Sequence, residues 1–146
     1  MARKNGFTLI EMLIVLMIVS TLTIIAIPRL DQLKKAKEEA HMLEQLTDDL
    51  LYAQAYALTH KQSVVVVFYN AQGRYRMTER YMLGTVLLDR TLPNPWKIEL
   101  STLQNPLTFL ANGNVNKSGT VLLKNGKTTY RLVFLLGKGR FYVQKL

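Results

Sequence analysis

The sequence predicts an α+β protein in which a long N-terminal helix packs on an antiparallel β-sheet head. The first observation is an apolar run of 21 residues, 7–27, that carries a single charge. The second is a helical spacing of apolar residues over 30–59, and the third is a series of short alternating segments after it, separated by turn motifs. The helix therefore has a transmembrane half (7–27) and an amphipathic half (28–60), followed by the head (61–146).

The apolar run has the length and the flanking charges of a single-pass membrane span. A helix over residues 7–27 is about 31 Å long, which matches the hydrocarbon core of a bilayer at about 30 Å. Arg3 and Lys4 precede the run without an acid nearby, so the positive-inside rule predicts a cytoplasmic N-terminus and an extracytoplasmic head. A secretory signal peptide is the competing interpretation, but Pro28 and Arg29 follow the run without a clear Ala-x-Ala cleavage site.

Glu11 is the single charge inside the run. A carboxylate in a spanning helix costs about 2.5 to 3.5 kcal/mol on insertion scales, so it needs a partner. Cleavage after Gly6 would create one, because the new α-amino group of Phe7 would lie one helical turn from Glu11, in the same chain or in a neighbour packed alongside. An uncut signal anchor that tolerates one charge near the membrane interface is the alternative interpretation.

The start of the chain resembles the class III signal of type IV pilins and pseudopilins, through Lys4-Asn5-Gly6-Phe7-Thr8-Leu9-Ile10-Glu11-Met12-Leu13. The resemblance implies that a prepilin peptidase removes residues 1–6 by cutting between Gly6 and Phe7, and that it methylates the new amine. It also implies that Glu11 guides assembly with other pilins in a filament. Pro28 falls where these proteins commonly have a helix-bending proline.

The segment after the apolar run has the pattern of an amphipathic helix. One stripe is apolar: Leu33, Ala36, Ala40, Leu43, Leu46, Leu50, Ala53 and Ala57. The opposite face is charged: Lys35, Glu38, Glu39, Asp48 and Asp49. Because the pattern resumes directly after Pro28, we predict one long helix from about Thr8 to Thr59, with a kink at the proline.

The remainder of the chain predicts strands joined by recognisable turns. The expected strands are Ser63 to Tyr69, Tyr75 to Tyr81, Lys97 to Leu100, Leu107 to Leu110, Thr120 to Lys124, Thr128 to Leu136 and Arg140 to Gln144. Residues 70–73 and 124–127 are hairpin signals, 136–139 joins the last two strands, and the proline-rich 92–95 is a loop. A sheet of this size is marginal alone, so the amphipathic half-helix is expected to cover its apolar face.

This layout resembles the pilin fold over the whole chain, and the head narrows the resemblance. The segments around Leu107-Thr108-Phe109, Ser118-Gly119-Thr120-Val121, Tyr130-Arg131-Leu132-Val133 and Leu136-Gly137-Lys138-Gly139-Arg140 are similar to ComGD-type minor pseudopilins of competence systems. The same spacing is similar to GspH/FimT minor pilins. The resemblance implies a structural subunit of a DNA-uptake filament at the cell surface. A subunit of a type II secretion or type IV pilus system is the alternative, and an uncut extracellular binding domain is a third.

The sequence carries no set of residues that predicts catalysis. It has no cysteine and two histidines, His41 and His60, which lie too far apart on the predicted helix to share a metal. Neither a His-Glu-x-x-His motif nor a phosphate-binding Gly-x-x-x-x-Gly-Lys loop is present. We therefore expect no enzyme activity, no metal site and no cofactor.

The basic C-terminal region is the feature that could bind a ligand. The chain has a net charge of +9, and residues 101–146 contain seven bases and no acid. Bases bind DNA phosphates and interleaved aromatics stack on the bases of a single strand. The candidate DNA contacts are Arg131, Lys138, Arg140, Tyr142 and Lys145.

Strand alternation should place Arg140, Tyr142 and Gln144 on one face and Phe141 and Val143 on the other. DNA-uptake minor pilins of the FimT kind carry a Gly-Arg-x-Arg element, whose second arginine is absent here because Tyr142 takes its place. In the competing interpretation, the basic residues prevent the sheet edge from aggregating with other strands, or they interact favourably with an anionic cell envelope.

Overall fold

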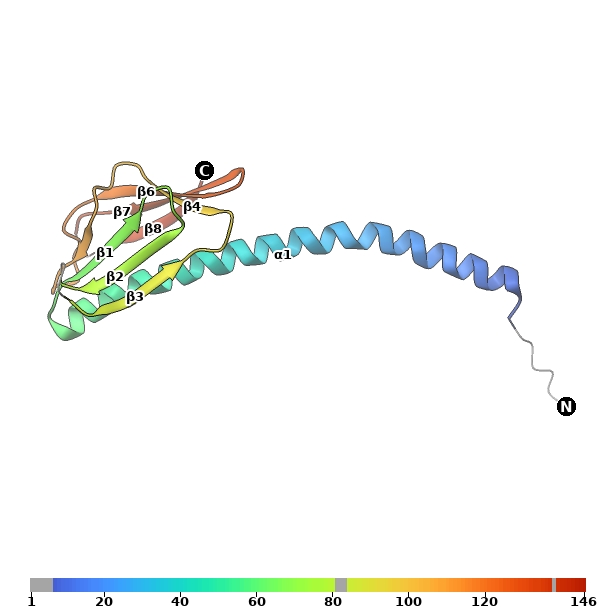
Figure 1. The fold of residues 1–146 in the computed structure, drawn as a ribbon, viewed down its shortest axis with the longest axis horizontal. Coiled ribbons are helices and arrows are strands. Elements are labelled where there is room, and N and C mark those ends of the chain that lie inside the picture. Colours follow the sequence, from blue (N-terminus) through green and yellow to red (C-terminus); the bar gives the residue numbers. More distant parts are fainter. Residues whose placement is uncertain (1–6, 81–83, 138) are drawn as a thin grey trace. The chain divides into compact units, whose positions relative to one another are not determined.

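The computed structural model describes residues 7–80, 84–137 and 139–146, and it describes 24–32 by their backbone alone. The described elements are a helix and eight strands (Figure 1). They are α1 (Leu9–His60), β1 (Val64–Tyr69), β2 (Arg74–Glu79), β3 (Val86–Thr91), β4 (Trp96–Leu100), β5 (Leu107–Phe109), β6 (Gly119–Asn125), β7 (Thr128–Phe134) and β8 (Phe141–Lys145).

The predicted long helix is present as α1. It begins at Leu9, directly after Thr8, and it ends at His60, where Lys61 adopts a positive φ of 53°. A left-handed residue at this position terminates a helix, a role that glycine fills more often. Residues 1–41 and 42–146 form two separate compact units. The second of these, which we call the head unit, contains the last five turns of α1 and all the described strands.

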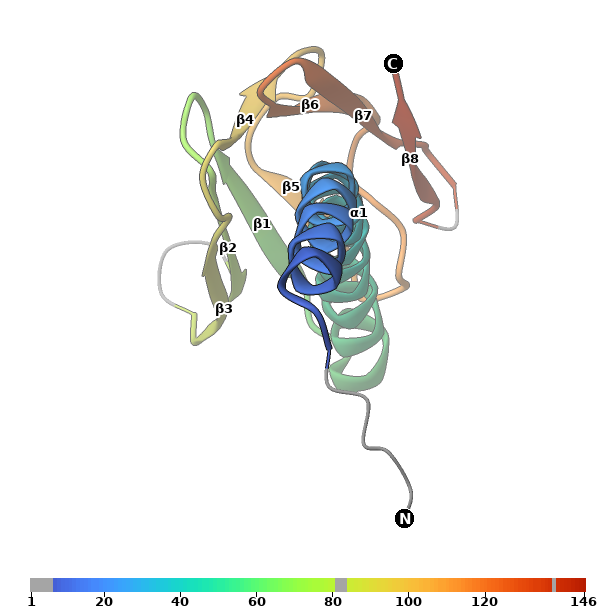
Figure 2. The ribbon, with the colours of Figure 1, turned by 90° about the vertical axis from the view of Figure 1, so that its right-hand side faces the viewer.

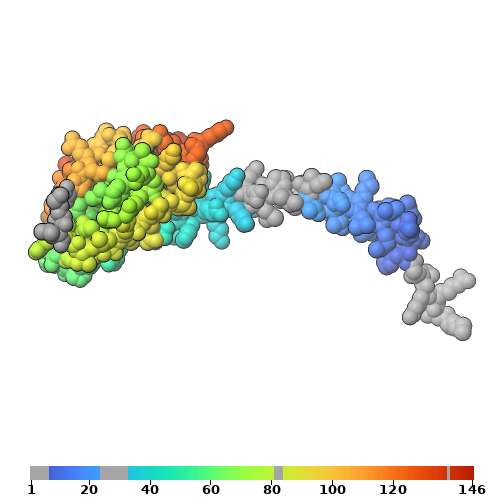
Figure 3. Space-filling view, viewed as in Figure 1, coloured from blue at the N-terminus to red at the C-terminus, as the bar shows by residue number. Residues whose placement is uncertain are grey.

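The strands of the head unit form two antiparallel sheets of four, where the sequence predicted one. Sheet A has the order β3-β2-β1-β5, and sheet B has the order β4-β6-β7-β8. The hairpins at 70–73 and 124–127 join β1 to β2 and β6 to β7 as predicted, and β7 pairs with β8. In Figure 3, residues of β1 to β3, green to yellow, form the near face of the head.

The core of the head unit lies between the helix and both sheets, as the amphipathic pattern predicted. Met42, Leu46, Leu50, Ala53 and Ala57 of α1 are all buried. They pack in one cluster with inward side chains of both sheets. In Figure 2 the two sheets arch over this part of α1. Burial of large apolar side chains at this junction, at about 1.5 to 3 kcal/mol each, holds the helix to the sheets.

The structure corrects two expectations about the head. Strand β3 was not predicted, because its apolar start is broken by Asp89 and Arg90 and it runs directly into the proline-rich loop. Asp49 was expected on the exposed face of the helix, but it is only 8% exposed. One contact links the two corrections, because Arg90 of β3 reaches over to Asp49.

Candidate assembly site and head surface

Glu11 closes the first turn of α1 within its own chain. Its backbone N–H donates to the Thr8 hydroxyl over 3.3 Å, and the Thr8 N–H donates to a Glu11 carboxylate oxygen over 3.4 Å. These reciprocal bonds form a capping box, which satisfies N–H groups that the helix leaves without an internal partner. This contact was not predicted from the sequence, although a threonine followed three residues later by a glutamate is its signature.

The predicted cleavage point lies at the limit of the described residues. Phe7 is described and is 77% exposed, whereas Gly6 lies outside the described residues. Pro28 lies within the helical backbone of α1, but its side chain is outside the described part, so the kink stays a prediction. The leader cleavage likewise stays a prediction.

The first turns of α1 expose large apolar side chains. Those that are more than half exposed are Leu9, Ile10, Met12, Leu13, Ile14, Leu16, Met17, Ile18, Val19 and Leu22. The hydroxyls of Ser20, Thr21 and Thr23 donate to backbone carbonyls four residues earlier, over 2.5 to 2.7 Å, so the helix itself satisfies them. Over the stretches whose side chains are described, no helical segment combines the length and the hydropathy of a membrane span.

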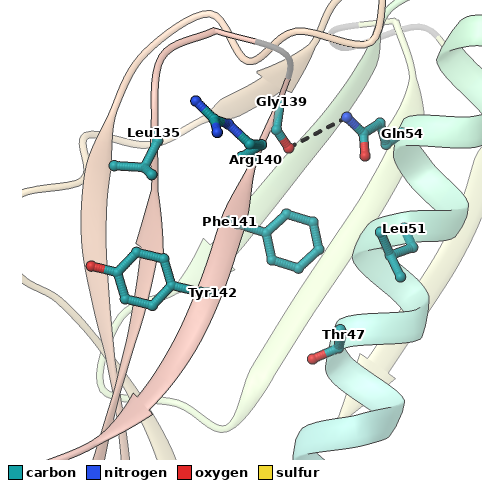
Figure 4. A pocket seen from close by; sticks show the side chains of 8 residues that line it. All are labelled: Thr47, Leu51, Gln54, Leu135, Gly139, Arg140, Phe141 and Tyr142. Atoms are coloured by element: carbon teal, nitrogen blue, oxygen red, sulfur yellow. Dashed lines mark hydrogen bonds between the residues drawn. The ribbon is translucent and has the colours of Figure 1, made fainter.

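The candidate DNA contacts fall on different sides of sheet B. Arg131 pairs with Gln144, and Tyr142 pairs with Val133 across the β7–β8 ladder. Arg131 and Tyr142 are exposed on the face away from the core, and Arg140 turns the same way as Tyr142 in Figure 4.

Lys145 belongs to the other face of sheet B. It pairs with the inward-facing Tyr130, and its ammonium lies 5.8 Å from the centre of that ring. Lys138 lies outside the described residues. The structure therefore brings Arg131, Arg140 and Tyr142 together on one face and separates Lys145 from them.

An open groove of about 470 Å³ lies between α1 and β8. It is lined by Thr47, Leu51, Gln54, Leu135, Gly139, Arg140, Phe141 and Tyr142. Figure 4 shows the Phe141 ring directed toward α1, as strand alternation predicted. The Gln54 amide closes one end of the groove by donating to the carbonyl oxygens of Gly113 at 2.8 Å and Gly139 at 3.3 Å.

A buried polar cluster fastens α1 to sheet A on the other side of the helix. The Asp49 carboxylate accepts a hydrogen bond from the Tyr75 hydroxyl over 2.5 Å and two from the Arg90 guanidinium over 2.6 and 3.0 Å. Burial, followed by the bond to Asp49, raises the pKa of Tyr75 well above its usual value, so the phenol stays protonated and donates. These bonds satisfy a buried carboxylate that would otherwise be costly.

The described residues contain no cluster of three or more His, Cys, Asp or Glu side chains with the geometry of a metal site. His60 instead stacks on Tyr56, with ring centroids 3.9 Å apart. The geometry thus presents packing surfaces, a groove and a basic face.

Comparison with known proteins adds two family matches, one for each region of the chain. Residues 1–27 match the prokaryotic N-terminal methylation motif. Residues 43–137 match the family described as type II transport protein GspH. The chain is also similar to competence protein ComGD of Bacillus subtilis (strain 168), with 28% identity over 142 residues that cover 97% of this chain and 94% of the relative.

Solved structures of similar fold come from two kinds of machinery. The type IV minor pilin FimU of Pseudomonas aeruginosa (strain PAO1) has a TM-score of 0.62 at 18% identity, covering 75% of this chain and 90% of FimU. The minor pseudopilin EpsH of the type 2 secretion system of Vibrio cholerae has a TM-score of 0.56 at 15% identity, covering 76% of this chain and 95% of EpsH. Both likenesses show the fold predicted from the sequence.

Proposed function

The chain belongs to the GspH family and is a minor pseudopilin with the type IV pilin fold, and from this premise we propose that it is a structural subunit of a competence pilus for the uptake of transforming DNA. The observation that carries the proposal is the similarity to competence protein ComGD, which extends over nearly the full length of both chains. The GspH match alone spans 43–137, and the family is described as a type II transport protein.

The proposal places the chain in the cell membrane as a single-pass protein. Residues 7–27 cross the bilayer with the N-terminus in the cytoplasm, and 28–60 continue as the amphipathic half of α1 toward an extracytoplasmic head, 61–146. The exposed apolar side chains of the first turns and the basic residues before them support this topology. After assembly, the head stands at the cell surface in a filament.

Processing and assembly depend on three residues in this proposal. A prepilin peptidase cuts between Gly6 and Phe7, removes 1–6 and methylates the new amine of Phe7. Glu11 then meets the N-terminus of an adjacent pilin. The match of 1–27 to the N-terminal methylation motif supports both steps. Pseudopilins are structural subunits, so the partners are other pilins, the peptidase and the membrane.

A finer part of the proposal is direct contact with extracellular DNA through Arg131, Arg140 and Tyr142. Their shared exposed face supports it, since two cations and an aromatic ring can meet phosphates and a base together. Lys138 adjoins this group in sequence, and Lys145 lies on the other face of the sheet. The absence of acids from 101–146 adds a favourable potential.

The test is natural transformation, assayed together with protein secretion, in a strain that lacks the gene and is complemented with wild type or Glu11→Val. We expect wild type to restore transformation and Glu11→Val to fail, because it removes the assembly carboxylate while leaving membrane insertion intact. Membrane fractionation of the variant is the control. Full transformation by Glu11→Val would show that this carboxylate is not an assembly contact.

A type II secretion or type IV pilus subunit is the second candidate, favoured by the fold shared with EpsH and FimU. In that case the deletion strain transforms normally and secretion or piliation fails. The same strain therefore separates the two candidates.

A further inference from the structure

Segments of the same chain cover two of the lateral edges of the sheets. At the β4 edge, the β1–β2 hairpin forms backbone hydrogen bonds. The Ala71 N–H donates to the Ile98 carbonyl oxygen over 2.8 Å, and the Ile98 N–H donates to the Gln72 carbonyl oxygen over 3.0 Å. At the β5 edge, the Asn116 N–H donates to the Thr108 carbonyl over 2.9 Å, and the Thr108 N–H donates to the Asn116 side chain over 2.9 Å. Covered edges cannot accept another strand.

The edge formed by β3 is irregular. The ladder between β2 and β3 shifts register at Met77/Thr78, and such a bulge increases the local twist and discourages further pairing. Asp89, in the middle of β3, is held by Arg74 and Arg76 of the neighbouring strand. This edge is therefore protected by shape and charge.

The fourth edge, β8, is regular and has no covering segment among the described residues. Its ladder with β7 runs without interruption from Phe141 to Lys145. The Leu135 N–H donates to the Arg140 carbonyl oxygen, and the Leu146 N–H donates to the Thr129 carbonyl oxygen, both over 2.9 Å. Because antiparallel backbone groups alternate in direction, the even-numbered residues bond to β7. The N–H and C=O groups of Phe141, Val143 and Lys145 therefore point outward from sheet B.

The groove between α1 and β8 lies directly beside this open edge. Phe141 and Val143 are partly buried and pack against the core on the groove side. Across the groove, Leu51 of α1 is 48% exposed. A strand added along β8 would place alternate side chains in the groove and the others beside the exposed basic face.

The positive charge around β8 indicates which kind of added strand would bind at this edge. Arg140 is the charged residue among those that line the groove, and Arg131 lies on the outer face of the neighbouring strand. A second copy of β8 would bring bases against bases, since residues 101–146 contain no acid. An acidic segment would instead meet complementary charge.

We infer that β8 accepts an extended segment of another polypeptide as a fifth strand of sheet B. Apolar residues of this segment alternate with acidic ones. The apolar residues enter the groove between Phe141 and Leu51, and the acidic residues lie beside Arg140, with Arg131 one strand further away. The inference concerns the head unit alone and does not depend on the filament role.

The test uses the full chain in detergent micelles and a synthetic peptide in which valine alternates with glutamate. Amide hydrogen exchange is measured by NMR with and without the peptide. We expect exchange at Phe141, Val143 and Lys145 to slow about tenfold, the factor that corresponds to one added hydrogen bond. Tyr142 and Gln144, already bonded to β7, should change little.

A pair of variants at one position separates the backbone donor from the side chain. Val143→Pro removes an outward N–H without removing a bond to β7, and edge strands tolerate such a proline. It should weaken peptide binding at least about tenfold, whereas Val143→Ala, which keeps the N–H, should weaken it less. If Val143→Pro fails to fold, the exchange pattern of the wild type still decides.

Four outcomes would overturn the inference. The first is an unchanged exchange pattern with the peptide. The second is equal protection by a control peptide in which lysine replaces glutamate, which would remove the charge argument. The third is protection that grows with protein concentration alone, which would identify a second copy as the occupant. The fourth is protection of the same amides by a single-stranded oligonucleotide and not by the peptide.

Discussion

At the scale of single residues, Asp49 shows how one buried carboxylate can connect a helix to two strands. It accepts from Tyr75 of β2 and from Arg90 of β3, so it fixes α1 against sheet A by directional bonds as well as by packing. Buried charges require such partners. A helical wheel cannot reveal them, because the partners come from strands that lie far along the chain.

Removal of this carboxylate should destabilise the head unit. We expect Asp49→Ala to lower the free energy of unfolding by about 2 to 3 kcal/mol, since it leaves Arg90 and the Tyr75 hydroxyl without their acceptor. Asp48→Ala, at the exposed neighbouring position, is the control and should change stability by less than about 0.5 kcal/mol. Urea unfolding of the full chain measures both. Equal losses would mean that the bonds to Asp49 contribute nothing.

The proposed DNA contact also belongs to single residues. Arg131→Ala and Arg140→Ala should each weaken binding of single-stranded DNA and reduce the salt slope by about 0.7 per lost phosphate contact. Lys124→Ala is the matched control, because Lys124 is already paired with Glu99 at 2.7 Å. Titrations at several salt concentrations measure the slopes. Identical slopes for all three variants would remove the DNA interface.

At the scale of elements, the β7–β8 connection depends on Gly139. This residue has a φ of 59°, and an added Cβ would lie 2.0 Å from the Gly113 carbonyl oxygen. The turn therefore packs against a neighbouring loop and against Gln54 of α1. Gly137 has a φ of 91° but no atom within 4 Å of an added Cβ.

The two glycines should respond differently to alanine. Gly139→Ala combines backbone strain with a steric clash, so we expect a loss of about 3 kcal/mol. Gly137→Ala adds strain alone and should cost about 1 kcal/mol. Thermal unfolding followed by circular dichroism compares them. A Gly137→Ala loss as large as that of Gly139→Ala would contradict the close approach.

The β2–β3 pair should stabilise the protein in a pH-dependent way. Bonds from the guanidinium groups of Arg74 and Arg76 hold the pKa of Asp89 well below its usual range. A lowered pKa stabilises the fold fully above the usual carboxyl value, near pH 4, and this contribution decreases below that pH and is lost as the pH falls through the lowered pKa. The stability difference between wild type and Asp89→Asn should therefore shrink between about pH 5 and pH 2. Acid unfolding curves of both proteins measure it. A constant difference would contradict the ion pairs.

Sequence patterns predicted most of these elements, and the exceptions have physical causes. Helical spacing identified the buried stripe around Leu46 and Leu50, and turn residues identified two hairpins. Strand β3 was not predicted, because its central charges are satisfied by residues remote in sequence. The division into two sheets was not predicted, because the pairing of strands depends on residues in both partners. The capping box at Thr8 could have been predicted, since its spacing is local.

At the scale of the whole molecule, two parts of the chain match two different families. Residues 1–27 match the prokaryotic N-terminal methylation motif, whereas 43–137 match the GspH family. In the proposed function, these two parts of the chain have different roles. The first part carries processing and assembly, and the second carries the contacts of the assembled subunit.

Processing should be visible in the mass of the mature protein. We expect the native protein to begin at Phe7 with an N-methyl group, because the peptidase is proposed to cut after Gly6. Intact-mass spectrometry of the membrane fraction measures this, with a strain that lacks prepilin peptidase as the control. An intact Met1 terminus in cells with an active peptidase would contradict the processing proposal.

The capping box fixes the direction of the Glu11 carboxylate at the start of α1. One carboxylate oxygen accepts the Thr8 N–H, and a carboxylate has further lone pairs that can accept other donors. In the proposed assembly, a neighbour's amine would therefore meet an acceptor whose orientation is already set within its own chain. A contact of this kind favours one alignment of the subunits over the others.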